Sequence, residues 1–275
     1  MRSLSTLSFV FLCVLPITAR AQVSPVAPLQ IGDTFTIQST ALGEQRRINV
    51  YLPELYNATP TTRLPVLYMP DGGIGEDFLH VAGLLQVLIG NESMRPFILV
   101  GIENTQRRRD LTGPTMSADD KKIAPKVGES AAFRAFIRTE LMPAITARYR
   151  TTNETAIMGE SLAGLFVVET LLLEPTLFDT YVAFDPSVWW NDGGLVKTAP
   201  AQLRAIGNQP KTLYVASSSD DHGDMIKAFA DVLKRSAPQS LTWHYRPMPE
   251  ETHATIYHPA ALQALRVLFK PGDRR

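Results

Sequence analysis

Apolar runs of two kinds alternate along the chain. Short continuous apolar runs, which are typical of buried strands, occupy residues 64–69 and 97–102. Other stretches have an apolar residue at every third or fourth position, which is typical of helices, and they lie between the strand-like runs. Two strand-like segments joined through Gly43 come first and predict an antiparallel hairpin. Strands are predicted at residues 34–39, 46–52, 64–69, 97–102, 155–158, 181–184, 212–216 and 241–245, and helices at 78–89, 130–148, 162–173, 223–235 and 259–269.

This order of elements predicts an α/β fold, with a mostly parallel central sheet and helices on both faces. The polar stretch 103–128 has little periodicity, and its length is typical of a functional loop or lid. Pro143 is the weak point of the helix at 130–148, because proline removes a helical hydrogen bond.

The first 21 residues have the pattern of an export signal. Arg2 is basic, residues 7–17 are apolar, and Ala19 and Ala21 form a small-x-small cleavage site, but the apolar run is too short to span a bilayer. We therefore expect a periplasmic or secreted protein, with no integral membrane segment after signal removal and a single domain at residues 22–275. Cys13 is the only cysteine and lies inside the signal, so the mature chain is expected to have no disulfide.

Charge excludes some classes of partner. The chain has 27 basic and 27 acidic residues, and this balance gives no reason to expect nucleic acid or an anionic membrane surface as a partner. No pair of histidines has the spacing of metal ligands, so no metal site is expected.

Residues 159–164 read Gly-Glu-Ser-Leu-Ala-Gly and stand between a predicted strand and a predicted helix. This is the context of a nucleophile elbow, in which a strained turn exposes the serine and small residues on either side let strand and helix approach. The segment therefore predicts Ser161 as a nucleophile. The alternative is that Ser161 only caps the helix.

In the α/β-hydrolase fold the general base is a histidine that follows the last strand. His253 stands there, between the strand at 241–245 and the last helix, and is predicted to take the proton of Ser161. Three other histidines, at positions 80, 244 and 258, fit structural roles better.

The triad acid is expected in the loop after the strand at 212–216. Asp221 is the preferred residue, while Asp220, Asp224 and Glu251 remain alternatives. Such an acid holds the histidine in the tautomer that the reaction needs.

An oxyanion hole needs two amides. The chain offers Leu162, directly after the nucleophile, and Gly73, in the turn after the strand at 64–69. The sequence Asp-Gly-Gly at 71–73 is equally compatible with an ordinary turn.

Several segments together resemble the esterase family that includes esterase D, the enterochelin-type siderophore esterases and the bacterial mycolyltransferases. They are residues 67–73 (LYMPDGG), 100–105 (VGIENT), 107–112 (RRRDLT), 159–164 (GESLAG), 185–190 (DPSVWW) and 252–254 (THA). The resemblance covers nearly all of the mature chain and implies an α/β-hydrolase that cleaves a small-molecule carboxylic ester through an acyl-enzyme, without metal or cofactor. Two positions depart from the family pattern: Glu160 replaces a frequent histidine, and Ala163 a frequent glycine.

Two further groups are candidates for substrate contacts. Trp189 and Trp190 are expected to line the acyl pocket, unless they belong to the core. The arginines at 107–109 could meet an anionic substrate, although a solvated loop is the simpler interpretation. The leading hypothesis is an exported serine ester hydrolase that acts on siderophore, aryl or sugar esters. The alternatives are an acyltransferase that uses the same site and a non-catalytic binding protein on a hydrolase scaffold.

Overall fold

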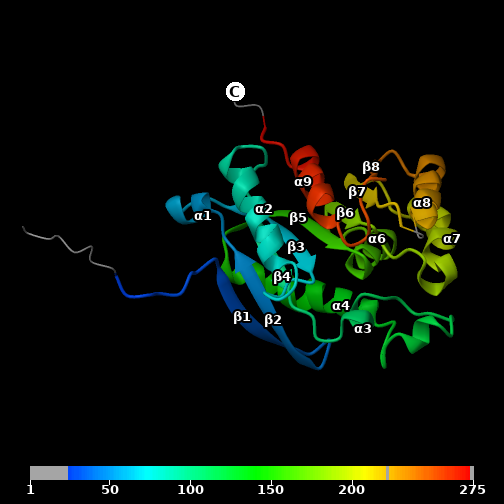
Figure 1. Cartoon of the computed structure of the whole chain (residues 1–275), viewed down its shortest axis with the longest axis horizontal. Coiled ribbons are helices and arrows are strands. Elements are labelled where there is room, and N and C mark those ends of the chain that lie inside the picture. The colour runs from blue at the N-terminus through cyan, green and yellow to red at the C-terminus, as the bar shows by residue number, and fades with distance from the viewer. Residues whose placement is uncertain (1–23, 221–222, 273–275) are drawn as a thin grey trace, which may run out of the picture. The chain divides into compact units, whose positions relative to one another are not determined.

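The computed structural model describes residues 24–220 and 223–272, so the predicted export signal lies outside the described residues. Contacts divide the chain into two units, Met1–Ile31 and Gly32–Arg275. Within the first unit, residues 24–31 contain no helix or strand. The second unit contains a single eight-stranded sheet, in the order β1-β2-β4-β3-β5-β6-β7-β8 (Figure 1). The strands are β1 Asp33–Ser39, β2 Glu44–Tyr51, β3 Leu64–Pro70, β4 Ile98–Ile102, β5 Thr151–Glu160, β6 Thr180–Phe184, β7 Lys211–Ser217 and β8 Leu241–Pro247.

Strand directions follow the prediction. β2 is antiparallel to both β1 and β4, and every other pairing in the described sheet is parallel. The carboxyl ends of the parallel strands therefore lie along one edge of the sheet, where ligands bind in open α/β folds. The predicted fold class is confirmed.

The helices are α1 Glu54–Ala58, α2 Phe78–Gly90, α3 Arg107–Asp110, α4 Ser130–Phe136, α5 Met142–Arg148, α6 Leu162–Leu173, α7 Trp190–Arg204, α8 Gly223–Ser236 and α9 Tyr257–Leu268. The sequence did not predict α1, α3 or α7, and the helix expected at 130–148 is interrupted. A π-helical turn at Ile137–Leu141 separates α4 from α5, immediately before Pro143. Proline donates no backbone hydrogen bond, and this explains why the regular helix stops there.

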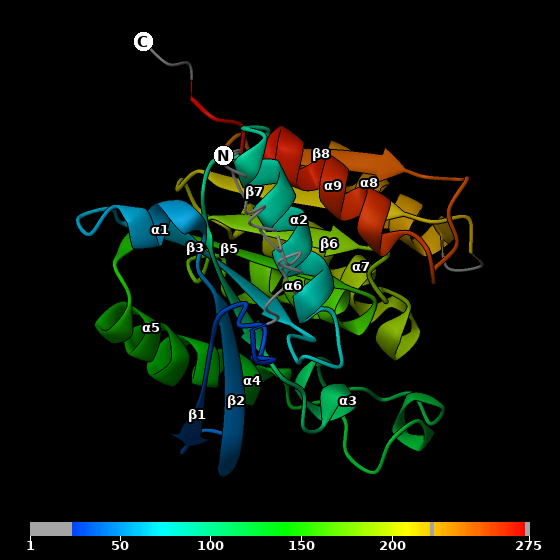
Figure 2. The same cartoon turned by 60° about the vertical axis from the view of Figure 1, so that its left-hand side comes forward.

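The central strands contribute side chains to two hydrophobic core layers, one on each face of the sheet. Leu67 and Met69 of β3 pack with α2 and α9, whereas Val66 and Tyr68 pack with α4, α6, α7 and α8. The helices α2 and α9 contact each other on one face of the sheet (Figures 1 and 2). Because both faces are covered, the central strands β3, β4 and β6 are buried at every position, which is why their sequences are largely apolar runs.

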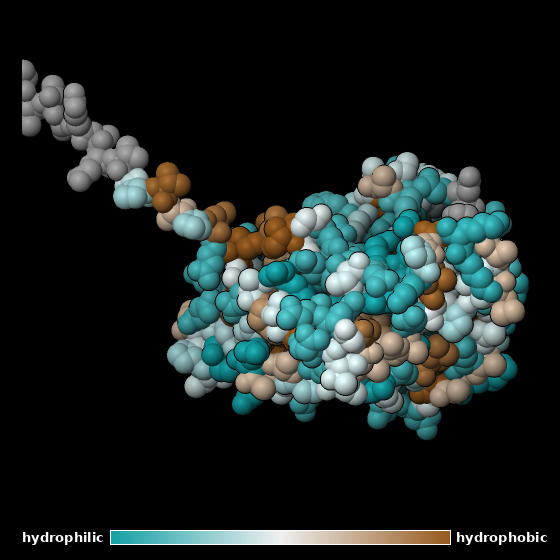
Figure 3. Space-filling view, turned by 90° about the horizontal axis from the view of Figure 1, so that it is seen from below, coloured by the Kyte–Doolittle hydropathy of each residue, from teal (hydrophilic) through white to brown (hydrophobic). Residues whose placement is uncertain are grey.

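No helix within residues 24–220 and 223–272 is long and apolar enough to cross a membrane. The most apolar one, α6, has nearly all of its residues buried against the sheet. The face seen in Figure 3 is mainly hydrophilic, with hydrophobic side chains in small separate groups.

A buried ion cluster fixes the start of the long loop that follows β4. Arg46 of β2 is fully buried and pairs with Asp110, while Glu44 pairs with both Arg46 and Arg109, at 2.9 and 2.7 Å. Burial alone would raise the pKa of Glu44, but the hydrogen bonds from Arg109 and Thr105 and the charge of Arg46 lower it to about 2. The cluster therefore stays ionised, and loss of one partner would leave a buried charge uncompensated.

The turn that follows β3 packs closely against the backbone of β4. A Cβ on Gly72 would lie 2.3 Å from the Cα of Gly101, so Gly72→Ala must displace backbone. We expect it to destabilise the protein by about 3 kcal/mol and to lower Tm by roughly 6–12 °C in thermal unfolding. Gly75→Ala is the matched control, since no atom lies within 4 Å of a Cβ at that position. Equal Tm values for the two variants would contradict the packing argument.

Candidate active site

Ser161 occupies a strained turn between β5 and α6. Its backbone has φ 60° and ψ −121°, a conformation that side-chain-bearing residues rarely adopt. A Cβ on Gly159 would lie only 2.6 Å from the Cβ of Ala163, so only glycine fits at this close approach of strand and helix. This is the geometry expected of a nucleophile elbow.

Hydrogen bonds join the elbow to the turn that follows β6. The Ser161 amide donates to the carbonyl of Phe184 at 3.0 Å, and the Ser161 carbonyl accepts from the amide of Ser187 at 3.0 Å. Asp185, between these two partners, also has a left-handed backbone, with φ 43°. The carboxylate of Asp185 is thereby held at the same edge of the sheet as the serine.

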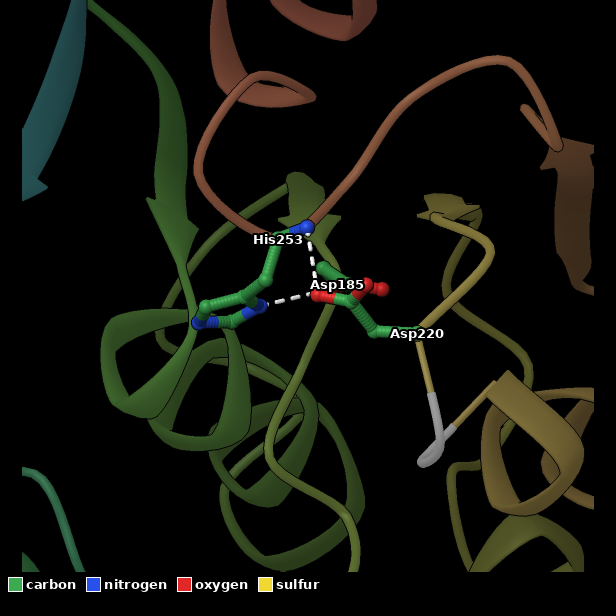
Figure 4. Close-up of side chains that lie close together, drawn as sticks. All are labelled: Asp185, Asp220 and His253. Atoms are coloured by element: carbon green, nitrogen blue, oxygen red, sulfur yellow. Dashed lines mark hydrogen bonds and ion pairs between the residues drawn. The ribbon is translucent and has the colours of Figure 1, made fainter.

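His253 connects Ser161 with Asp185. Its Nδ1 lies 2.6 Å from Oδ2 of Asp185 (Figure 4). Its Nε2, on the other side of the ring, lies 3.1 Å from the Oγ of Ser161. These contacts form a continuous hydrogen-bonded chain from hydroxyl to imidazole to carboxylate. The three residues come from the end of β5, the end of β6 and the loop before α9.

Opposing effects set the protonation of this chain. Burial raises the pKa of Asp185, but hydrogen bonds from His253 and from the amide and hydroxyl of Ser218 outweigh it and lower the pKa. The hydrogen bond to Asp185 raises the pKa of His253, against burial, and the charges of Glu160 and Asp220 act in the same direction. Asp185 is therefore ionised at neutral pH and favours an imidazolium at His253.

The carboxylate at Nδ1 is not one of those expected from the sequence. Asp221 lies outside the described residues, and Asp224 is an exposed residue in the first turn of α8. Asp220 accepts the backbone N–H of His253 at 2.7 Å, so it holds the loop rather than the ring (Figure 4). For Glu251 the described contacts are made by its backbone: its carbonyl accepts from Ser219, and its amide donates to the carbonyl of Met248. Among the described residues, the carboxylate at Nδ1 follows β6 rather than β7, because the turn tied to the elbow brings Asp185 there. The assignment of Asp221 as the acid stays a prediction.

Asp185, Asp220 and His253 also bring potential metal-ligand atoms within 4.8 Å of one another. Each carboxylate, however, accepts a hydrogen bond from His253, one from the ring and one from the backbone. These hydrogen bonds explain the cluster, and we assign no metal ion to it.

The two predicted oxyanion donors differ in whether their N–H groups already have a hydrogen-bond acceptor. Leu162 is the first residue of α6, so its N–H has no carbonyl partner within the helix. The N–H of Gly73 already donates to Oε2 of Glu76 at 2.7 Å. Gly73 can contribute only if the Glu76 carboxylate moves away, and its role stays a prediction.

A cavity of about 440 Å³ opens at Ser161. Trp189 lines it together with Ile226, as expected for an acyl pocket. Trp190 does not, and that expectation is corrected: its side chain is buried, and its indole N–H donates to the carbonyl of Gly113 at 2.8 Å. The lining residues are Ser161, Asp185, Pro186, Ser187, Trp189, Ser219, Asp220, Ile226 and His253.

The arginines at 107–109 are not simply a solvated loop. Arg107 forms a two-pronged ion pair with Asp71, at 2.7 and 2.8 Å, and Arg109 belongs to the buried cluster with Glu44. Both guanidinium groups thus already have carboxylate partners, and the structure offers neither as an unpaired cation for a substrate.

Several known proteins are similar to this chain in sequence and in fold. The chain is 26% identical over 274 residues to ferri-bacillibactin esterase BesA of Bacillus subtilis, an alignment that covers 87% of this chain and 93% of that protein. It is 31% identical over 194 residues to a siderophore triacetylfusarinine C esterase of Aspergillus fumigatus, with 63% and 62% covered. Among solved structures, an IroE-like serine hydrolase of Shewanella oneidensis matches with a TM-score of 0.80 and 30% identity, over 87% of this chain and 80% of that one.

The sequence pattern of a protein family described as "Putative esterase" matches residues 39–256. This range includes Ser161, Asp185 and His253, and the relatives' names support the predicted class of carboxylic ester hydrolase. The family match and the relatives also confirm the resemblance drawn from the sequence motifs. The chain belongs to this esterase family.

Proposed function

We propose that the protein is a serine carboxylic ester hydrolase that works through an acyl-enzyme, with Ser161 as nucleophile, His253 as general base and Asp185 as the triad acid. The observation that carries the proposal is the hydrogen-bonded chain from Ser161 Oγ through both nitrogens of His253 to Asp185. Fold alone would not assign this chemistry, since many functions share it.

The geometry supports the following sequence of steps. Ser161 Oγ attacks the ester carbonyl while Nε2 of His253 takes its proton, and the Leu162 amide at the start of α6 faces the developing negative charge. His253 then returns the proton to the alcohol as its C–O bond breaks, leaving the acyl group on Ser161. Water repeats the attack with His253 again as base, releasing the carboxylic acid and restoring the serine.

We further propose that the natural substrate is a siderophore ester. The support comes from the relatives, which are named as esterases of ferri-bacillibactin and triacetylfusarinine C. Trp189 supplies an aromatic wall to the cavity beside Ser161, a lining suited to a bulky acyl group. Export through the signal at residues 1–21, to the periplasm or the medium, is part of the same proposal.

Hydrolysis of p-nitrophenyl esters tests the nucleophile and the base. We expect Ser161→Ala and His253→Ala each to lower kcat/KM by at least about a thousandfold, because each removes a group needed for the chemical step. Circular dichroism should show unchanged folding. Near wild-type activity in folded Ser161→Ala would sink the assignment.

A set of Asp→Asn variants tests the acid. We expect Asp185→Asn to lower kcat by roughly 10³–10⁴-fold, because the amide removes the charge and the acceptor that orient His253. Asp220→Asn should cost about tenfold or less, since it weakens a backbone contact and leaves Nδ1 paired. Asp221→Asn is the matched neighbouring control. A larger loss in either loop variant than in Asp185→Asn would return the acid to the loop after β7.

Competition between ester classes tests the substrate. We expect kcat/KM for a siderophore lactone such as enterobactin to exceed that for p-nitrophenyl butyrate by at least about tenfold, because binding of remote groups contributes to transition-state stabilisation. Chromatography of the released acids measures it. If the protein hydrolyses simple aryl esters but cleaves no siderophore, the assignment as an ester hydrolase stands and the proposed substrate class is rejected.

A further inference from the structure

Glu160 places a second carboxylate beside His253. It is the last residue of β5, directly before Ser161, and its Oε1 lies 3.3 Å from Nε2 of His253. This is the same nitrogen that faces Ser161 Oγ at 3.1 Å, whereas Asp185 binds the opposite side of the ring at Nδ1. His253 therefore lies between two carboxylates.

Within the part of the chain that the structure describes, one carboxylate oxygen of Glu160 lacks the hydrogen bond that normally accompanies burial. Its side chain is 16% exposed, and Oε1 is buried and accepts no hydrogen bond from any described residue. Such an atom is costly unless it gains a partner. A protonated His253 is the partner within reach, and it forms each time the ring takes the proton of Ser161.

Other charges also face this pair. Arg107 of α3 acts on Glu160 as a cation, while Asp185 and Asp71 act as anions. The negative charge of Glu160 contributes to the raised pKa of Tyr257 on α9. Asp220, in the loop after β7, is a further negative charge that raises the pKa of His253. Burial is the largest effect and raises the pKa of Glu160 to about 7, against the lowering effects of His253 and Arg107. Because Oε1 of Glu160 lies 3.3 Å from Nε2 of His253, the protonation of each group affects the other, and the two titrate as a coupled pair.

We propose that Glu160 is a positioning residue for the proton on His253: its carboxylate stabilises the imidazolium from the Nε2 side, as Asp185 does from the Nδ1 side. Glu160 takes no proton from the substrate or from Ser161. The proton moves from Oγ to Nε2 and from there to the leaving alcohol, and the nearby negative charge makes the protonated ring more stable at each stage. The inference rests on the proposed ester hydrolysis.

The test is the pH profile of kcat/KM for Glu160→Gln, which keeps the shape and removes the charge. An anion raises the pKa of a neighbouring base, so its removal lowers the pKa of His253, and the acid limb should move to lower pH by roughly 0.5–1 unit. The plateau above pH 8 should fall severalfold, because a weaker base accepts the serine proton less readily. Glu160→Asp, which keeps the charge, should retain more of the wild-type profile.

Glu154→Gln is the matched control. It removes the same charge from the same strand, about 20 Å along β5, where Glu154 pairs with Arg95. We expect its pH profile to equal that of the wild type, because charges at that distance are screened. A Glu160→Gln profile that is lower at every pH but not shifted, or shifted to higher pH, would overturn the inference and indicate a structural role.

A second measurement does not depend on turnover. In the Ser161→Ala variant, NMR titration of the His253 ring protons should show two steps, one of which disappears in Ser161→Ala/Glu160→Gln. A single, identical step in both proteins would reject the coupling. Inactivity of the wild type on all esters would overturn the proposed function, whereas an active wild type with an unshifted Glu160→Gln limb would overturn this inference alone.

Discussion

The left-handed backbone of Ser161 is the constraint on which the site depends. A strained residue persists only where its surroundings hold it, and the strain costs about 1–3 kcal/mol. Here the contact of Gly159 with Ala163 sets the approach of β5 to α6, and hydrogen bonds to Phe184 and Ser187 fix the turn from the neighbouring strand. The same two hydrogen bonds locate Asp185, so Ser161 and the Asp185 carboxylate are positioned by one unit of backbone rather than by separate loops.

The central strands β3, β4 and β6 could be predicted because they are buried at every position and their sequences are largely apolar runs. The missed helix α7 lacks such a signal. It begins with three residues of positive φ, at 191–193, and contains Pro200, so neither its start nor its interior has a helical pattern. The break between α4 and α5 had a local cause, Pro143, and the sequence marked its place but not the π-helical turn that results.

Ser161 and His253 could be predicted from linear context, since one stands between strand and helix and the other follows the last strand. Asp185 could not be separated from its rivals in this way. β6 and β7 are adjacent parallel strands, and each is followed by aspartate at the same edge of the sheet. Which carboxylate reaches Nδ1 depends on the three-dimensional path of two turns. Trp190 and Gly73 show the same limit, because their partners Gly113 and Glu76 are chosen by packing.

The two carboxylates beside His253 differ in their own hydrogen bonds, and this difference divides their roles. Asp185 accepts from the amide and the hydroxyl of Ser218, which stabilise its charge and lower its pKa despite burial. Among the described residues, Glu160 has no such donor at Oε1, and its burial raises its pKa to about 7. One side of the imidazole therefore meets a fixed charge and the other a charge that varies near neutral pH. A substitution at Glu160 can then alter the response to pH while the Ser161–His253–Asp185 chain keeps its geometry.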